Sequence, residues 1–222
     1  PKGVELTHKN IVANCMASAQ VMPFRETDRS LSFLPWAHAF GKIVELHLLP
    51  FLGACVALAE SPKTITANLL EVNPTILVSV PKVFNTIYNI AHVRVETNGI
   101  RRAIFRHCEK LAQRKAIGQL SLVDRIQAPV LDRLVASKIR SVFGNALRFC
   151  ISGGASLSSQ VASFFMGFGI RIFEGYGMTE HAPVIAANSP SHTRIGSVGR
   201  PLPGVKVEIL QDDALPDCGN EK

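Results

Sequence analysis

The sequence predicts an α/β protein with a largely parallel sheet covered by helices, and three observations support this class. Short apolar runs alternate with helical segments almost from one end of the 222-residue chain to the other. Two of these runs, 74–81 and 146–154, are almost entirely apolar, which is typical of parallel strands buried on both faces. Hydrophobic residues make up 47% of the chain, which is enough for a sizeable core.

The first half opens with a helix at 10–21, because Thr7 precedes the helical pattern and threonine is a good N-cap. A strand follows at 30–35, and we expect it to end at Pro35. The remaining segments alternate in the same way: a helix at 41–52, a strand at 54–60, a short helix at 64–73 and a buried strand at 74–81.

The second half begins with a long helical region, 82–143, in which we expect breaks near Asn98–Gly99, at Gly118 and at Pro129. Its middle carries a predicted apolar face, followed by a looser one: Ile100, Ile104, Cys108, Leu111 and Ala112, then Leu134, Ile139 and Val142. We then expect a buried strand at 146–154, a helix at 157–168 capped by Ser156 or Ser158, and strands at 169–173, 183–188 and 205–210.

Three loops that contain glycine or histidine follow strands of this predicted sheet. They read "LPWAHAFG" at 34–41, "ISGGASL" at 151–157 and "EGYGMTE" at 174–180. Ligands of parallel sheets collect at the C-terminal ends of the strands, which lie along one edge. We therefore expect the three loops to build one site.

The third loop offers the most chemistry. Gly175 and Gly177 are expected to break the strand and to let backbone approach something closely. Tyr176 could lay its ring against a flat ligand, while the Thr179 hydroxyl and the Glu180 carboxylate suit phosphate and magnesium. The alternative interpretation is an ordinary turn at a strand end.

Several function classes are disfavoured by what the sequence lacks. No apolar run reaches membrane-spanning length, because the best candidate, 43–59, is interrupted by charged and turn-forming residues. Five widely spaced cysteines without a CxxC pair argue against a disulfide framework or a zinc site and fit a reducing, cytoplasmic location. A serine-hydrolase GxSxG elbow and an intact phosphate-binding GxxxxGK motif are both absent.

Positive charge is concentrated in the middle of the chain, where 12 Lys or Arg and 4 Asp or Glu lie between Arg94 and Arg148. Six of these cations are predicted on one helix: Arg101, Arg102, Arg106, Lys110, Arg114 and Lys115. Such a face can sit peripherally on an anionic membrane, and a merely solvated outer face is the alternative. A nucleic-acid partner is not expected.

Together the loops resemble the adenylate-forming (AMP-binding) superfamily of acyl-CoA synthetases and their relatives. The opening "PKGV" is similar to the tail of that family's phosphate loop, and "FLPWAHAFG" resembles the next motif. "GYGMTE" resembles the adenine- and magnesium-binding motif, and "IGSVGRPLPGVKVEI" the segment after it. Within the family, "VPKVFNTIY", the basic insert and "KIRSVFGNALRFCISGGASLS" look most like the long-chain fatty-acid group.

The resemblance implies a two-step ligase whose substrates are ATP, a fatty acid and coenzyme A, with Mg²⁺ as the metal. A carboxylate attacks the α-phosphate of ATP to give an acyl-adenylate and pyrophosphate, and the thiol of coenzyme A then displaces AMP. Both steps develop charge on oxygen, so positioned donors and a metal matter most. The fold it implies is part of the large N-terminal domain of an acyl-CoA synthetase.

The resemblance also assigns roles to individual residues. Thr179 would bond the α-phosphate as a catalytic residue, and Glu180 would be catalytic as the Mg²⁺ ligand. The nucleotide-binding positions would be Lys2, Gly153, Gly154, Ala155, Glu174, Gly175, Tyr176, Gly177 and Thr179. Tyr176 would flank the adenine, and Lys2 would lie beside the triphosphate. The acyl-binding positions would be His38 (as an aromatic gate), Gly154 and Gly177; without the family, His38 would be interpreted as a core or N-cap histidine.

The resemblance covers 1–222 as a partial AMP-binding domain. Most of the phosphate loop upstream, the ribose-binding carboxylate and the C-terminal lysine elements are not found in the sequence. We therefore expect the middle part of a larger enzyme, inactive by itself. Two alternatives stay open: an adenylation domain that loads an amino or aryl acid onto a carrier protein, and a non-catalytic nucleotide- or lipid-binding remnant.

Overall fold

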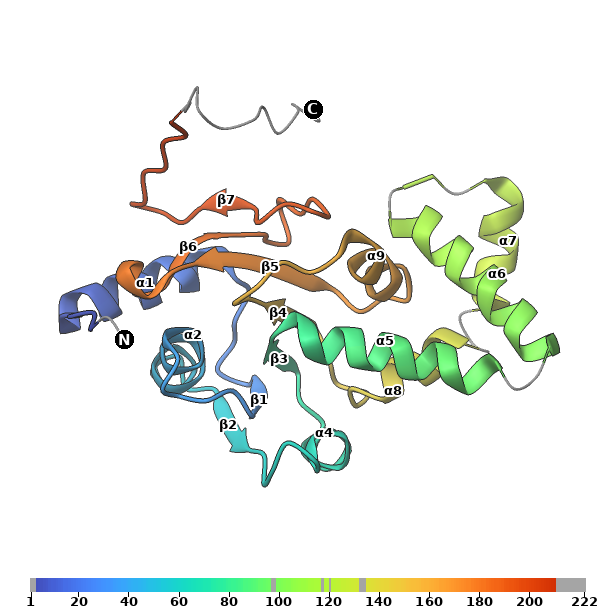
Figure 1. Cartoon of the computed structure of the whole chain (residues 1–222), viewed down its shortest axis with the longest axis horizontal. Coiled ribbons are helices and arrows are strands. Elements are labelled where there is room, and N and C mark those ends of the chain that lie inside the picture. Colours follow the sequence, from blue (N-terminus) through green and yellow to red (C-terminus); the bar gives the residue numbers. More distant parts are fainter. Residues whose placement is uncertain (1–2, 97–98, 117, 120, 132–134, 211–222) are drawn as a thin grey trace.

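The computed structural model describes residues 3–96, 99–116, 118–119, 121–131 and 135–210. The strands in this part are β1 (Arg29–Ser32), β2 (Cys55–Leu58), β3 (Ile76–Ser79), β4 (Phe149–Ser152), β5 (Ile172–Gly177), β6 (Val184–Ala187) and β7 (Arg200–Pro201). They form one sheet in the order β2-β1-β3-β4-β5-β6-β7 (Figure 1). Strands β1 to β5 run parallel, whereas β6 is antiparallel to β5 and to β7. The predicted α/β class is confirmed.

The described helices lie between these strands in the predicted order. They are α1 (His8–Val21), α2 (Ala39–Gly41), η1 (Lys42–Leu48), α3 (Leu49–Phe51), α4 (Ile65–Val72), α5 (Pro81–Glu96), α6 (Gly99–Ala116), α7 (Leu122–Leu131), α8 (Ser137–Ser141), α9 (Ser159–Gly167) and η3 (Thr179–His181). Helices α6 and α7 lie at the end of the molecule opposite α1 (Figure 1). We call α5 to α8 the helical lobe.

Two predicted N-caps are present. The Thr7 hydroxyl accepts a hydrogen bond from the Asn10 amide at 3.2 Å, so a threonine begins α1 as expected. At α9 the capping residue is Ser158, whose hydroxyl accepts from the Val161 amide at 3.3 Å. Both helices therefore begin where the local sequence predicts.

Both faces of the parallel sheet are buried, as the apolar runs predict. One face packs against the helical lobe and α9, and it contributes Leu31, Leu77, Cys150 and Ile172. The other face packs against η1, α3 and the segment after α1, and it contributes Ile76, Val78, Phe149, Ile151 and Phe173. Alternate residues of each strand point to opposite faces, so β3 and β4 need apolar side chains at nearly every position.

The predicted helix at 41–52 is helical but not regular. Residues Lys42–Leu48 form a π-helix, flanked by the short α-helical turns α2 and α3. π-helical segments are rare and occur frequently at functional sites. This segment follows directly after the loop that carries His38.

Three predicted elements are wrong in detail. Residues 205–210 form no strand, because they are mostly exposed and no other described strand pairs with them. Pro129 does not break the helical region but lies inside α7, near its end. The strand predicted to end at Pro35 already ends at Ser32, where the loop begins.

The predicted apolar face of α6 is only partly correct. Cys108, Leu111 and Ala112 are buried, but Ile100 is 74% exposed and Ile104 is 39% exposed. Phe105 is the other buried member, and its ring packs on Phe164 of α9. The buried side of α6 therefore lies against α9. Leu134 lies outside the described residues; Ile139 is buried and Val142 is half-buried.

Candidate functional site

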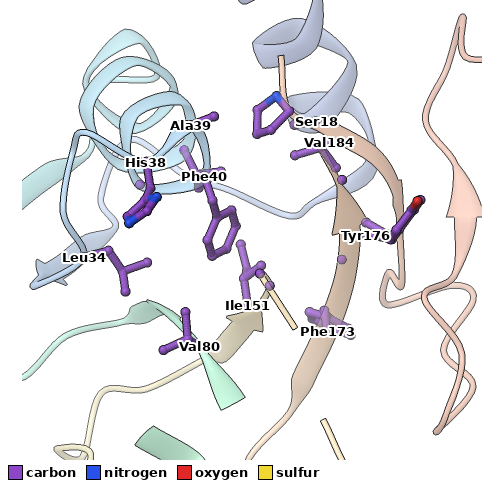
Figure 2. A pocket seen from close by; sticks show the side chains of 18 of the residues that line it. Ser18, Leu34, His38, Ala39, Phe40, Val80, Ile151, Phe173, Tyr176 and Val184 are labelled. Atoms are coloured by element: carbon purple, nitrogen blue, oxygen red, sulfur yellow. The ribbon is translucent and has the colours of Figure 1, made fainter. Parts of the chain in front are cut away.

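A cavity of about 460 Å³ opens at the C-terminal ends of the central strands. The three predicted loops contribute to its walls: Leu34, Pro35, His38, Ala39, Phe40 and Gly41; Gly153, Gly154 and Ala155; Gly175, Tyr176, Gly177, Met178 and Thr179. Figure 2 shows Leu34 and His38 on one side of this cavity, Ile151 in the middle and Tyr176 on the other side. The structure therefore brings the three loops together around one space.

The loop after β4 needs glycine for steric reasons. A β-carbon at position 153 would lie 2.9 Å from the Phe40 ring, and the Gly153 amide donates to the Ser79 carbonyl at 3.2 Å. Gly154 has φ +82°, a left-handed conformation that side chains rarely adopt. Close packing and backbone conformation thus explain the "GG" pair in this wall.

Glu174, at the start of the third loop, makes a hydrogen bond that connects it to the loop after β4. Its carboxylate is buried and accepts a hydrogen bond from the Leu157 amide at 2.9 Å. Its backbone carbonyl accepts from the Asn188 amide at 2.8 Å, in the segment that follows β6. Glu174 is not among the residues that line the cavity, so its side chain orders the loop after β4.

The prediction that Gly175 and Gly177 break the strand is wrong. Strand β5 continues through both glycines and pairs with β6, with a register shift between Tyr176 and Gly177. A β-carbon at Gly177 would overlap the Pro183 carbonyl oxygen. The backbone that approaches this glycine is therefore the chain's own, and the turn begins only at Met178, whose amide donates to the same carbonyl at 2.9 Å.

Thr179 and Glu180 begin the short helix η3 beyond this strand. Both are exposed, and Thr179 lines the cavity. No group of three or more His, Cys, Asp or Glu side chains converges within the described ranges. A single exposed carboxylate beside a hydroxyl still fits Mg²⁺, because this ion is usually held by one or two carboxylates together with substrate phosphates and water.

Tyr176 and His38 line the cavity from different elements. The Tyr176 side chain is 50% exposed, which leaves its ring available to a flat ligand. His38 is exposed, so it is not a core histidine, and although it stands at the N-cap position of α2 its side chain makes no capping bond. Lys2 lies outside the described residues.

Several residues that line the cavity or hold its walls carried no signal that the sequence analysis used. The Asn14 side chain, buried in α1, donates to the Val184 carbonyl at 2.8 Å and accepts from the Val184 amide at 3.2 Å. Phe40 packs on Gly153, and Lys82 is the cationic amine among the described lining residues. An asparagine among the small, buried residues of α1 is a signal that could have identified Asn14.

A second cavity, of about 930 Å³, lies among α4, α5, α6 and α8. Its lining is largely aliphatic, with Ile87, Ile90 and Ile139 as examples. None of the predicted site residues that the structure describes lies there. The candidate site is therefore the smaller cavity.

A family model described as "AMP-binding enzyme" matches residues 1–221. The chain belongs to the AMP-binding enzyme family. Among curated relatives, the long-chain-fatty-acid–CoA ligase FadD15 of Mycobacterium bovis is 32% identical over 97% of this chain and 36% of its own length. The peroxisomal long chain acyl-CoA synthetase 6 of Arabidopsis thaliana is 33% identical over 95% of this chain and 30% of its own length.

The solved structure of a benzoate CoA ligase from Burkholderia xenovorans LB400 is similar, with a TM-score of 0.65 and 25% identity. It covers 99% of this chain and 37% of the benzoate ligase chain. This AMP-binding chain thus spans about a third of the length of the curated relatives it matches. None of its helices within the described ranges combines the length and apolar character needed to cross a bilayer.

Proposed function

We propose that this chain is the nucleotide- and acyl-binding part of a long-chain fatty-acid–CoA ligase. The observation that carries the proposal is the cavity into which the three strand-end loops converge. Its interior is mostly apolar, as at Leu34, Ile151 and Phe173, while Thr179 and Lys82 add polar groups to the lining. A fatty-acid chain needs an apolar surface and ATP needs polar groups. The fatty-acid carboxylate and the α-phosphate of ATP must also lie close together for adenylation.

Each group of residues has a role in this proposal. Tyr176 and the glycine loop at 153–155 would hold the adenine between them, because both line the cavity and the loop has no large side chain there. The Thr179 hydroxyl would bond the α-phosphate. His38 and Phe40 would separate the nucleotide from the acyl chain, which would pass Gly154 and Gly177.

Magnesium would bind at the end of β5. Glu180 would supply the protein carboxylate, and the phosphate oxygens of ATP together with water would complete the coordination. When bound, the metal would neutralise negative charge on the phosphates. The thiol of coenzyme A would then attack the acyl-adenylate and displace AMP, which gives the thioester.

An aryl acid is the alternative substrate, and one observation favours it: the benzoate CoA ligase structure overlays nearly the whole chain. The fatty-acid ligases among the curated relatives are more similar in sequence, at 32% and 33% identity against 25%. Substrate-dependent pyrophosphate exchange in the complete enzyme separates the two. We expect exchange with a long-chain fatty acid and little with benzoate.

The test of the site is Glu180→Gln in the complete enzyme. We expect adenylate formation to fall by at least about 100-fold, because a charged metal ligand supplies several kcal/mol to the transition state. Folding should be unchanged, since Glu180 is exposed. The matched control is Glu60→Gln, another exposed glutamate, which should leave exchange unchanged. Near-normal exchange in Glu180→Gln would overturn the assignment.

We also propose that the helical lobe contacts anionic membrane, where a fatty acid would reside. Both acids described on α6 and α7 face inward: Glu109 accepts from the Tyr88 hydroxyl at 3.0 Å, and Asp124 pairs with Arg114 at 2.9 Å. The exposed charged side chains described on these helices are therefore cations: Arg102, Arg106, Lys110, Lys115 and Arg125. The side chain of Arg101 lies outside the described set. Such cations each add about 1 kcal/mol of attraction to anionic lipid.

A further inference from the structure

The π-helix η1 carries a carboxyl group that the proposed chemistry does not use. Glu45 is fully buried, with an exposed fraction of 0%. A buried carboxyl group is costly unless other groups satisfy it. Its partners are two serine hydroxyls of β1: Ser32 at 2.8 Å and Ser30 at 3.4 Å.

The hydrogen bonds continue from Glu45 into the loop that lines the cavity. The Trp36 indole N–H donates to the Ser32 oxygen at 3.1 Å, since an indole can only donate. The Ser32 hydroxyl then has its own proton free to donate to Glu45. Trp36, Ser32 and Glu45 thus form a directed chain that joins the loop at 34–41, strand β1 and helix η1.

This chain ends two residues from His38. The loop makes no strand pairing after Ser32, and its described backbone contacts are local, such as the His38 amide to the Pro35 carbonyl at 3.0 Å. The Trp36 bond is therefore a side-chain tether between this loop and the core. Loss of the tether would move His38 and Phe40, which both line the cavity.

The electrostatic surroundings of Glu45 are simple. Burial raises its pKa to about 8, while the hydrogen bonds from Ser32 and Ser30 act in the opposite direction. The titratable groups on elements packed against it are His8, Lys9, Cys15, Arg29, Lys42 and His47, and none is among the causes of the shift. Burial favours the neutral carboxyl group, so Glu45 should ionise only as the pH rises toward 8. The Ser32 hydroxyl donates more strongly to a carboxylate than to a neutral carboxyl group, so the tether should change at that pH.

We infer that Glu45 is a positioning residue that sets the loop at 34–41, and with it His38 and Phe40, through Ser32 and Trp36. The inference rests on the proposed function for its purpose, because it concerns how the walls of that cavity are held. It does not place Glu45 in contact with any ligand. The link between Glu45 and the loop can be tested without measuring enzyme activity.

Trp36 is the single tryptophan of the chain, so tryptophan fluorescence reports on the surroundings of this one side chain. We expect the emission of Trp36 and its quenching by acrylamide to change as the pH is raised, with a midpoint near 8. Glu45→Gln keeps the size and hydrogen-bonding capacity of the side chain but cannot titrate, so this transition should vanish. An unresponsive wild-type protein, or an identical transition in Glu45→Gln, would overturn the inference.

Ser32→Ala provides an independent variant if Glu45→Gln does not fold, as judged by circular dichroism. It leaves Glu45 in place but removes the link to Trp36, so the fluorescence transition should be lost or reduced severalfold. Ser61→Ala is the matched control because this serine belongs to a turn before α4 and should leave the transition unchanged. A transition that persists at full amplitude in Ser32→Ala would overturn the inference.

The link to the cavity needs a separate measurement. In the complete enzyme, the affinity for a fluorescent ATP analogue should change severalfold as the pH rises through 8 in the wild type. The same profile should be flat in Glu45→Gln. An ATP analogue that fails to bind at any pH, together with a normal Trp36 transition, would overturn the proposed function and leave the tether intact. Equal pH profiles in both proteins would overturn the inference.

Discussion

The strand-end cavity and the helical lobe are held together by different kinds of contact. Around the cavity, backbone lies against backbone and ring against backbone, as at Gly177 with Pro183 and Gly153 with Phe40. In the lobe, contacts run between long side chains, such as Arg114 with Asp124 at 2.9 Å. The Tyr88 hydroxyl and the His92 Nε2 atom also lie 3.0 and 3.2 Å from Glu109 Oε1. These contacts join α5 to α6.

This difference determines how each region should respond to change. Backbone contacts at van der Waals distance leave no room for an added methyl group, so small substitutions around the cavity should have large effects. Exposed or half-exposed ion pairs are screened by water and contribute little individually. Substitutions in the lobe should therefore change stability by small amounts that depend on pH and salt.

The largest expected effect is that of Gly177→Ala. The new methyl group would overlap the Pro183 carbonyl and force β5 away from β6, and we expect a loss of about 2–4 kcal/mol in the free energy of unfolding. Gly175→Ala is the matched control, because a β-carbon there would lie 3.6 Å from the Ala186 carbonyl oxygen, an ordinary contact. Urea unfolding measures both. Equal destabilisation by the two substitutions would contradict this contrast.

A smaller effect is expected where the added group meets a movable ring. Gly153→Ala would press on Phe40 at 2.9 Å, and the ring can shift into the cavity. We expect about 1–2 kcal/mol of destabilisation, because overpacking is partly relieved by the movement. Phe40→Leu introduced together with Gly153→Ala should recover part of this loss in a double-mutant cycle. Strictly additive losses would indicate that the two residues do not contact each other.

In the lobe, the expected effect depends on pH. The Ser121 amide, the Ser121 hydroxyl and then Arg114 lower the pKa of Asp124 below its ordinary value of 3.8. The ionised Asp124 carboxylate therefore stabilises the folded state above pH 3.8. This stabilisation is lost as the pH falls through the lower pKa that Asp124 has in the folded state. Thermal unfolding should show that Asp124→Asn loses less stability than the wild type on acidification. Parallel curves for the two proteins would mean that Asp124 contributes nothing through its charge.

The smallest effect on the fold is expected on the outer face of α6. The triple substitution of Arg102, Arg106 and Lys110 by Gln should leave unfolding unchanged but weaken binding of the complete enzyme to anionic vesicles. Wild-type binding should fall steeply with salt. Substitution of three other exposed cations, Lys9, Lys63 and Arg194, is the matched control. Binding that ignores both salt and the triple substitution would support a merely solvated face.

The sequence by itself determined the order and type of most elements. Strands β3 and β4 lie where continuous apolar runs predict them, and Thr7 and Ser158 cap their helices as local chemistry requires. The three loops could be assigned to one edge because parallel strands all end there. These features depend on neighbours within a few residues, and periodicity and capping can therefore predict them.

Tertiary structure decided which side chains meet. Asn14 binds Val184 across 170 positions of sequence, and Trp36, Ser32 and Glu45 join a loop, a strand and a π-helix. No local pattern encodes such pairs. The strand expected at 205–210 failed for the same reason, because a strand also needs a partner and a surface to cover it, and the described part of the chain offers neither.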